Sequence, residues 1–536
     1  MISLRSHRRG EDQIAMTLDR FARNELRLAA LAKLPKKTRT AWSLGTLLEL
    51  DGDDPYALTW GADYAAGAEN RKLALLVGEG VVPLALPELA AMPITRVNTG
   101  QTLASAKPSL VKKLLQRQEL RGLRELDLLG ANVGSAAAEL SGCDALEALG
   151  LGSSSLVAEG LARASLPALK RLEVRRNKLG ARDLLTLLTA PGLPRLEALD
   201  AGANAVTDDG FDALVQSGAL SRLRALTLET GPATRVSPDG WAAFATSPHV
   251  ERLRALSVGV GGASNVLDAL LTAERLRELR SLSVGLASSL RRVELPALES
   301  FAVTLLDPAS ITALLASPAP PNLRALDLTV GWFDLAALPA LYRSPWCAGL
   351  SSLTLRCSGF RTPEDAAAAF DLPAIPSLRA LSLRCTVPTA ALSRVLSCGA
   401  LESLRIDELQ PGGGHALAAS DGFASVKELR VETGRTEPDA FAALVTSPHA
   451  AALQGLSWGC GAVGPEGVQA LLDAATCERL VALSFQTTAG VDEVLKARLF
   501  ENPRTPRLWT LTGGGFVAAP KSVRGAMRTR VAPARD

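Results

Sequence analysis

The feature that most constrains this chain is a short apolar pattern, L-x-x-L-x-L or a close variant, which recurs fifteen times between residues 123 and 485. Successive copies begin 19 to 30 residues apart. They start at Leu123, Leu146, Leu169, Leu196, Leu223, Leu253, Leu279, Leu298, Leu323, Leu350, Leu378, Leu401, Val426, Leu453 and Leu480. A unit this short cannot bury an apolar face alone, so the copies must stack around a common core. The chain is therefore predicted to be a solenoid.

Each copy reads as a short strand, because apolar residues alternate with small or polar ones. Helical segments lie between copies, as in residues 208–218, 237–247 and 465–475, each with a polar or Pro start, an apolar stripe and a small-residue stop. Stacked strands would form a parallel sheet that the helices cover on one side. Because helices are wider than strands, an α/β horseshoe is predicted, with a parallel concave sheet and outer helices.

This pattern resembles the leucine-rich-repeat family, and the long helical repeats are similar to its ribonuclease-inhibitor-like class. The resemblance implies a protein that binds other proteins on its concave face. The chain departs from the family at the Asn that usually follows the strand. Asn177 and Asn204 keep it, Asn132 lies one residue late, and most copies have Gly, Ser or Thr there. The two segments Ile94–Val97 and Leu508–Leu511 are interpreted as degenerate edge copies.

Four regions are predicted along the chain. Residues 1–16 form a flexible N-terminus, 17–91 a small helical N-terminal region or cap, 92–515 the solenoid, and 516–536 a basic, disordered tail. Residues 55–67 resemble a short companion domain found ahead of some bacterial repeat arrays, so a separate activity of this region stays open.

Two places interrupt the repeat. Only 19 residues separate Leu279 from Leu298, too few for a strand and a full helix, so a local change of curvature is expected. The connector after Leu401 contains Pro411-Gly-Gly-Gly, which is expected to prevent a helix from starting and to form a mobile rim loop.

The composition excludes several classes. A formal charge of +3 over 536 residues gives no global argument for nucleic acid. Basic residues near the N-terminus precede no apolar segment, and no run of 18 apolar residues occurs, so neither a signal peptide nor a membrane span is expected. Arg outnumbers Lys 46 to 12, a bias that favours a bacterial source.

The cysteines indicate a reducing compartment. There are seven, an odd number, with no C-x-x-C, so a cytoplasmic protein is predicted. Cys357 and Cys385 occupy the same position of adjacent copies, which places them within disulfide range. Two free thiols are nevertheless the prediction.

No residue pattern supports catalysis, a cofactor or a metal. Residues 459–464 read G-C-G-A-V-G, a full G-x-G-x-x-G between a strand and a helix, but they fall at the strand-to-helix turn of a repeat and no acidic residue ends the next strand. His249 and His449 both stand in T-S-P-H just before a strand, which is typical of a helix stop. No zinc-ligand spacing occurs. A non-enzymatic protein is expected.

Two sets of charged residues are expected on the predicted concave face. One consists of scattered acidic residues, Asp127, Glu173 and Asp200. The other consists of four arginines, hereafter the Arg group: Arg356, Arg384, Arg405 and Arg430. Like charges this close do not help folding, so the Arg group is the candidate contact for a protein partner that is acidic or bears phosphate. The alternative is a solvated face that Asp407, Glu408 and Glu432 neutralise.

The predicted function is a non-enzymatic protein–protein interaction scaffold that binds its partner on the concave face, with no nucleic acid or membrane involved. The alternative is a regulatory protein whose N-terminal region has its own activity and whose repeats act as a targeting arm.

Overall fold

The structure is a computed structural model that describes residues 96–98, 108–487 and 510–512, with short internal gaps. The gaps are residues 117–119, 122–123, 230–235, 260–263, 288–291, 306–307, 332–336, 358–359, 361–362, 435, 475–479 and 481. The predicted regions 1–16, 17–91 and 516–536 lie outside the described residues.

The described repeats fall into two compact units, and the chain passes from one to the other between Leu286 and Leu298. This division falls within the 19-residue spacing between Leu279 and Leu298, where the sequence pattern predicts an interruption of the repeat. The first unit holds β1 (Arg96–Asn98), β2 (Glu125–Asp127), β3 (Ala148–Gly150), β4 (Arg171–Glu173), β5 (Ala198–Asp200), β6 (Ala225–Leu228), β7 (Ala255–Gly259) and β8 (Ser281–Ala287). The second holds β9 (Ser300–Leu305), β10 (Ala325–Val330), β11 (Ser352–Cys357), β12 (Ala380–Val387), β13 (Ser403–Leu409), β14 (Glu428–Gly434), β15 (Gly455–Val463), β16 (Ala482–Thr487) and β17 (Thr510–Thr512).

Within each unit every strand pairs in parallel with the next one along the chain. The same repeat position is matched throughout: Leu126 pairs with Leu149, and Leu326 pairs with Leu353. Both degenerate edge copies are strands, since Val97 pairs with Leu126 and Leu511 with Leu483. The predicted parallel sheet and its register are confirmed.

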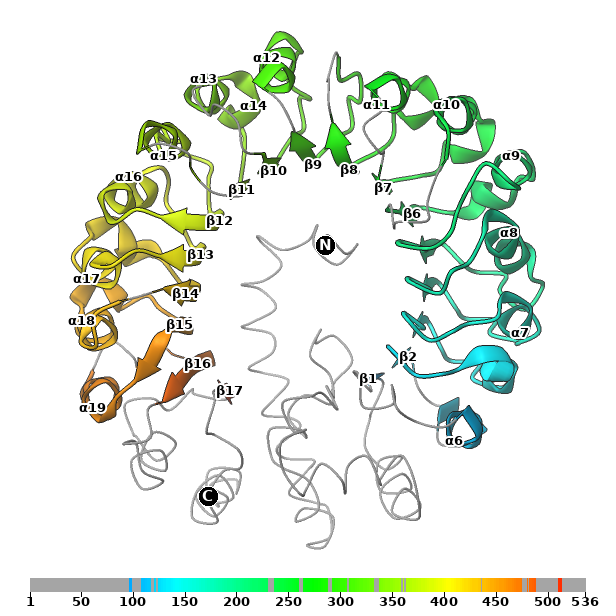
Figure 1. Ribbon diagram of the computed structural model, residues 1–536, viewed down its shortest axis with the longest axis horizontal. Helices are drawn as coiled ribbons and strands as arrows, with labels where there is room; N and C mark the ends of the chain where they lie inside the picture. The colour runs from blue at the N-terminus through cyan, green and yellow to red at the C-terminus, as the bar shows by residue number, and fades with distance from the viewer. Residues whose placement is uncertain are drawn as a thin grey trace, which may run out of the picture. The chain divides into compact units, whose positions relative to one another are not determined.

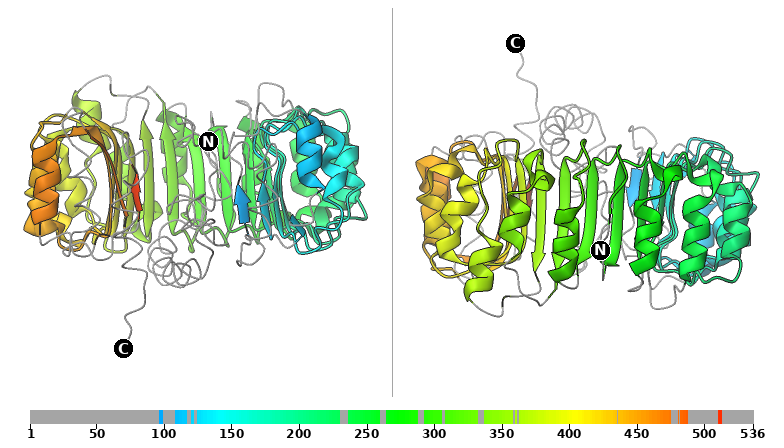
Figure 2. Two further views of the ribbon diagram at one scale, coloured as in Figure 1. Left: turned by 90° about the horizontal axis from the view of Figure 1, so that it is seen from below. Right: turned by 90° about the horizontal axis from the view of Figure 1, so that it is seen from above.

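Helices connect the strands and lie on one side of the sheet in each unit (Figures 1 and 2). In the first unit they are α6 (Pro108–Leu115), α7 (Ala158–Ala162), α8 (Ala181–Thr189), α9 (Phe211–Gln216), α10 (Pro238–Thr246) and α11 (Ser264–Leu271). In the second they are α12 (Pro308–Ala316), α13 (Leu338–Tyr342), α14 (Pro345–Ala348), α15 (Pro363–Ala369), α16 (Leu392–Ser397), α17 (Gly413–Ala418), α18 (Ala440–Thr446) and α19 (Pro465–Asp473). Short 3-10 helices are η4 (Gly134–Leu140), η5 (Ala219–Arg222), η6 (Pro248–Val250), η7 (Glu274–Leu276), η8 (Thr389–Ala391), η9 (Asp421–Ser425) and η10 (Pro448–Ala450).

The strand residues alternate between the core and the other face of the sheet. In β10, β11 and β12 buried and half-buried positions strictly alternate. The buried ones, such as Leu326 and Leu353 at 1% exposure, pack beneath the helices. The half-buried ones lie on the face opposite the helices, which is called the open face below. The predicted inward and outward phase is therefore correct.

Two asparagines, each following a strand, join successive repeats through their side chains. Asn177 and Asn204 are 7% and 2% exposed. The Asn204 side chain accepts from the backbone N–H groups of Asn177 and Leu179 and donates to the carbonyl of Ala201. Asn177 accepts in the same way from the preceding repeat. β4 and β5, which precede these two Asn residues, are three residues long, whereas β9 to β16, which lack the Asn, have six to nine residues.

The two T-S-P-H segments stop helices as predicted. Ser247 follows α10, donates to the carbonyl of Val215 one repeat earlier and accepts from the backbone of His249. Ser447 follows α18 and does the same with Ala418 and His449. The hydroxyl therefore ties each helix end to the neighbouring repeat.

The prediction of a rim loop without a helix after Pro411 is wrong, because α17 begins at Gly413. Gly412 adopts a left-handed φ of 80° and donates its N–H to the carboxylate of Glu437. A Cβ at Gly413 would overlap Leu409, and one at Gly414 would overlap Ala440. The glycines are thus what allows this helix to pack closely against its strand and the next helix.

Candidate functional site

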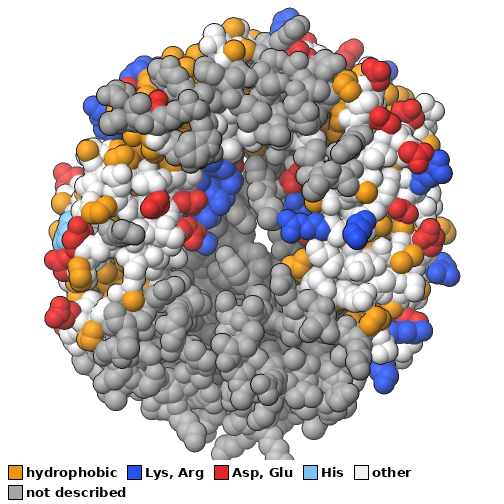
Figure 3. All heavy atoms as spheres, in the orientation of Figure 1, with side chains coloured by type: hydrophobic (Ala, Val, Ile, Leu, Met, Phe, Trp, Pro, Cys, Tyr) orange, Lys and Arg blue, Asp and Glu red, His pale blue; other side chains and the backbone are white. Residues whose placement is uncertain are grey.

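All four members of the Arg group lie on the open face of the second unit, on four consecutive strands. Arg356 on β11 and Arg384 on β12 are register partners, and Arg405 on β13 and Arg430 on β14 are register partners one pleat earlier along the strands. In a space-filling view, basic and acidic side chains gather there side by side (Figure 3). The four arginines therefore form two columns across the sheet, each made by two adjacent strands.

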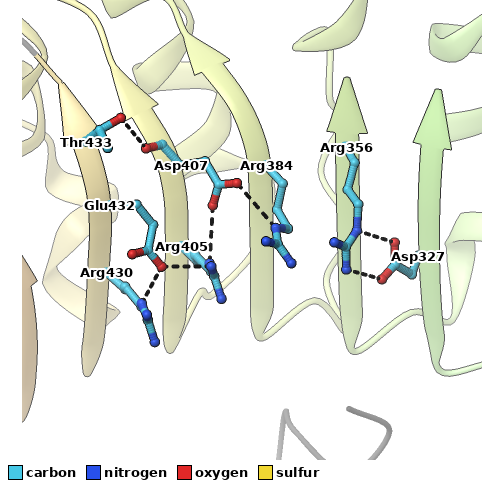
Figure 4. Close-up of polar contacts among 8 residues, drawn as sticks. All are labelled: Asp327, Arg356, Arg384, Arg405, Asp407, Arg430, Glu432 and Thr433. Atoms are coloured by element: carbon cyan, nitrogen blue, oxygen red, sulfur yellow. Dashed lines mark hydrogen bonds and ion pairs between the residues drawn. The ribbon is translucent and has the colours of Figure 1, made fainter. Parts of the chain in front are cut away.

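Arg356 is paired separately from the other three. Its Nε and Nη2 donate to the two carboxylate oxygens of Asp327 on β10, at 3.3 and 3.1 Å (Figure 4). This two-point contact uses the edge of the guanidinium that matches a carboxylate best. Arg356 is thereby neutralised within the sheet.

The other three arginines share two carboxylates in a continuous network (Figure 4). Asp407 on β13 lies 3.3 Å from the Nε atoms of both Arg384 and Arg405. Glu432 on β14 lies 2.7 Å from Nη2 of Arg405 and 2.5 Å from Nε of Arg430. Three positive charges therefore alternate with two negative ones across β12, β13 and β14, and these arginines are called the Arg trio below.

The Arg trio keeps unused donors at its tips. A guanidinium carries five N–H groups. Within the described residues, Arg384 and Arg430 use only Nε, so their Nη1 and Nη2 groups have no protein acceptor there. The side chains are 31%, 27% and 48% exposed for Arg384, Arg405 and Arg430. Burial, with Arg430 and Arg384 close by, lowers the pKa of Arg405, which reports the crowding of like charges.

Sequence reasoning identified two of the three neutralising acids. Asp407 and Glu432 act as expected, whereas Glu408 instead accepts from the hydroxyl of Thr386. Asp327 was missed as the partner of Arg356. The available signal was register: Asp327 pairs with Thr354, two residues before Arg356 on the same face, which makes the two side chains diagonal neighbours.

The open face around the Arg group is lined by small hydroxyl side chains. Thr329, Thr354, Ser382 and Ser457 occupy the neighbouring register positions and are all half-buried. A partner backbone can approach such a surface closely, since no large side chain of these strands stands between it and the arginines.

On the open face of the first unit, Asp200, one of the three predicted acidic residues, lies beside an arginine. Arg175 lies 3.6 Å from Asp200 and 2.5 Å from Glu229, and the hydroxyl of Ser257 donates to Glu229. Burial raises the pKa of Asp200 to about 6, although Arg175 and the N–H of Gly202 lower it. Asp200 is 6% exposed, so this network is mostly enclosed rather than open to a partner.

Cys357, the last residue of β11, and Cys385 on β12 directly follow the paired arginines and are buried on the core side. Cys357 and burial raise the pKa of Cys385, so the thiol form is favoured there. Both are free thiols, as predicted.

The G-x-G-x-x-G segment lies mainly within a strand and not in the predicted turn. β15 extends to Val463 with an irregularity after Trp458, and Gly464 precedes α19. A Cβ at Gly459 would overlap the carbonyl of Glu432, and Gly461 has a φ of 104°. These glycines therefore serve a close strand approach and a bulge. The described part of the chain contains no cluster of three His, Cys, Asp or Glu suited to a metal.

The in-register parallel strands, the helices on one side and the recurring Leu positions define an α/β leucine-rich-repeat solenoid. No helix in the described ranges is long and apolar enough to cross a membrane.

No protein-family model and no curated protein matches the chain. Solved structures do. An internalin from Listeria monocytogenes has 14% identity and a TM-score of 0.30, over 75% of this chain and 92% of its own. A chain of the yeast Rad7 and Elc1 complex has 15% identity and a TM-score of 0.34, over 76% and 88%. The TLR13–ssRNA13 complex has 15% identity and a TM-score of 0.38, over 79% and 70%. No ligand or partner of this chain follows from these likenesses.

Proposed function

We propose that the protein is a non-enzymatic interaction scaffold that binds a protein partner on the open face of its repeats, with the Arg group as the contact. The observation that carries this proposal is the Arg trio, in which the Nη groups of Arg384 and Arg430 have no acceptor among the described residues, on a face otherwise lined by Ser and Thr. Arginine is enriched at the centres of interfaces, where its planar fork can bind a carboxylate at two points.

The charge pattern favours protein over nucleic acid. The Arg group carries four positive charges. Its paired carboxylates, those of Asp327, Asp407 and Glu432, neutralise three of them. A nucleic-acid backbone presents closely spaced phosphates and favours faces with a large positive surplus. The interleaved carboxylates would repel it. A cytoplasmic location, in keeping with the cysteine content, is part of the same proposal.

The test is a charge reversal on full-length protein used as bait in its source extract. Arg384→Glu with Arg405→Glu should abolish capture of the partner, while circular dichroism stays unchanged. A matched control exists on the helix side: Arg343 and Arg394 share Asp371 as Arg384 and Arg405 share Asp407. Reversing that control pair should leave capture intact. Unchanged capture and salt dependence after reversing Arg384 and Arg405 would refute the proposal.

The second candidate is a regulator whose residues 17–91 have an activity of their own, with the repeats as targeting arm. A chain lacking residues 1–91 separates the two, provided that it folds. If the repeats alone capture every partner of the full chain, the scaffold function is sufficient. A partner or activity lost with residues 1–91 favours the regulator.

A further inference from the structure

The two acids of the Arg trio orient its arginines as well as neutralising them. Asp407 takes the Nε side of Arg384 and Arg405, and Glu432 takes the Nε side of Arg430. Figure 4 shows the three guanidinium groups extending in the same direction, past these acids. Contact at Nε restricts the plane of Arg384 and Arg430 while leaving their Nη groups available, whereas Arg405 also contacts Glu432 through Nη2 and keeps only Nη1 for a ligand. The trio is therefore held in place before any ligand arrives, which lowers the entropic cost of binding.

The spacing suits a ligand that lies across the strands. Neighbouring strands are about 4.8 Å apart, so the arginines on β12 and β14 are separated by about 10 Å. A side chain placed over β13 is within reach of Arg405 and of one or both of its neighbours. Ser382 and Ser457, the register partners of Arg405 and Arg430 on the flanking strands, leave room for the ligand backbone.

The charge balance selects the kind of anion. The trio and the two acids that pair with it sum to one positive charge, and the Arg356 and Asp327 pair adds none, while Glu408, which follows Asp407, accepts from the Thr386 hydroxyl instead of pairing with an arginine. One carboxylate neutralises this surplus. A phosphate group carries a charge of about −1.5 to −2 at neutral pH. This exceeds the single positive charge available and would place excess negative charge next to Asp407 and Glu432.

We propose that Arg384, Arg405 and Arg430 form a receptor for the carboxylate of an Asp or Glu side chain on an extended segment of the partner protein. This rests on the proposed function and narrows it in two respects. The Arg trio binds the ligand, whereas Arg356 pairs with Asp327 on the neighbouring strand and takes no part in binding. The ligand is a carboxylate and not a phosphate.

The test uses full-length protein and short Ser-rich peptides of one sequence, whose central residue is Glu, Gln or phosphoserine. Saturation-transfer difference NMR gives Kd values for such weak ligands. The Glu peptide should bind, with affinity falling as salt rises, and the Gln peptide should bind at least tenfold more weakly, since a charge-assisted hydrogen bond contributes about that much.

Single glutamine variants locate the receptor. Arg430→Gln, at the most exposed position of the trio, and Arg405→Gln should each weaken the Glu peptide about tenfold or more. Arg356→Gln should change its Kd less than threefold, and Arg394→Gln on α16 should leave it unchanged. Circular dichroism and the thermal midpoint show whether each variant is folded. If Arg405→Gln does not fold, Arg430→Gln still decides the test.

Three results would overturn the proposal. The Gln peptide could bind as tightly as the Glu peptide, the folded Arg430→Gln protein could keep the original Kd, or the phosphoserine peptide or a short single-stranded oligonucleotide could bind more than tenfold tighter than the Glu peptide. An equal loss from Arg356→Gln would overturn the restriction to three arginines. The capture experiment described above does not use the peptide, so the two proposals can fail separately. If charge reversal abolishes capture of the partner but the protein does not bind the Glu peptide, only the carboxylate assignment is disproved and the scaffold function stands.

Discussion

Replacing Asn204 with alanine should destabilise the first unit more than its small size suggests. Asn204 is 2% exposed, and its amide makes four hydrogen bonds to backbone groups of two successive repeats, with lengths of 2.8 to 3.1 Å. Alanine leaves the N–H groups of Asn177 and Leu179 buried without this acceptor. Leaving a buried donor unsatisfied costs about 1–3 kcal/mol, so two donors and two lost contacts to carbonyl groups predict a loss of about 3–6 kcal/mol.

Asn132→Ala is the matched control, because it makes the same chemical change at an exposed residue one position late in its repeat. It should alter the free energy of unfolding by less than about 0.5 kcal/mol. Urea unfolding followed by circular dichroism gives both values. Hydrogen exchange then localises the effect, since the amides of Asn177 and Leu179 should lose protection in Asn204→Ala. A loss under about 1 kcal/mol, or unchanged protection of both amides, would refute the view that the Asn204 side chain holds successive repeats together.

Four further predictions follow from the same structure. Leu326→Ala should cost about 2–5 kcal/mol in the free energy of unfolding measured with urea, because Leu326 is 1% exposed in mid-array, and a loss below about 1 kcal/mol would mean that its side chain is not a core residue. Chelator should leave the thermal midpoint unchanged, since stacked leucines form the core, and a clear drop would disprove this. Thiol counting on the denatured, unreduced protein should find seven free groups, whereas five would reveal a bridge such as Cys357 to Cys385 and contradict the cytoplasmic proposal. Burial raises the pKa of Asp200 in the folded protein from 3.8 to about 6. The folded protein therefore keeps this proton at pH values where the unfolded chain has lost it, and the contribution of Asp200 to the free energy of unfolding falls as pH rises from about 4 to 6. Asp200→Asn should therefore gain stability relative to the original protein over that interval, by at most about 3 kcal/mol at pH 7, and a difference in thermal midpoint that does not change with pH would show that Asp200 titrates normally.

The sequence by itself determined the repeat, the strand phase and the parallel register. Alternation between apolar and small residues has only one arrangement that buries every Leu, because shifting a strand by one residue would turn its apolar side chains outward. The sequence likewise marked Asn177 and Asn204 as the two positions that keep the family's Asn after the strand. The two columns of the Arg group followed from the same register, since equivalent positions of adjacent copies must lie side by side.

Only the tertiary structure decided contacts that depend on the separation between neighbouring repeats. Pro411-Gly-Gly-Gly looked like a helix breaker, yet α17 begins there because Gly413 and Gly414 allow it to approach Leu409 and Ala440. The pairing of Asp327 with Arg356 and the sharing of Asp407 by two arginines depend on side-chain directions that no repeat pattern encodes. Local propensity describes one residue at a time, whereas close packing and charge sharing are properties of residues that the fold brings together from different repeats.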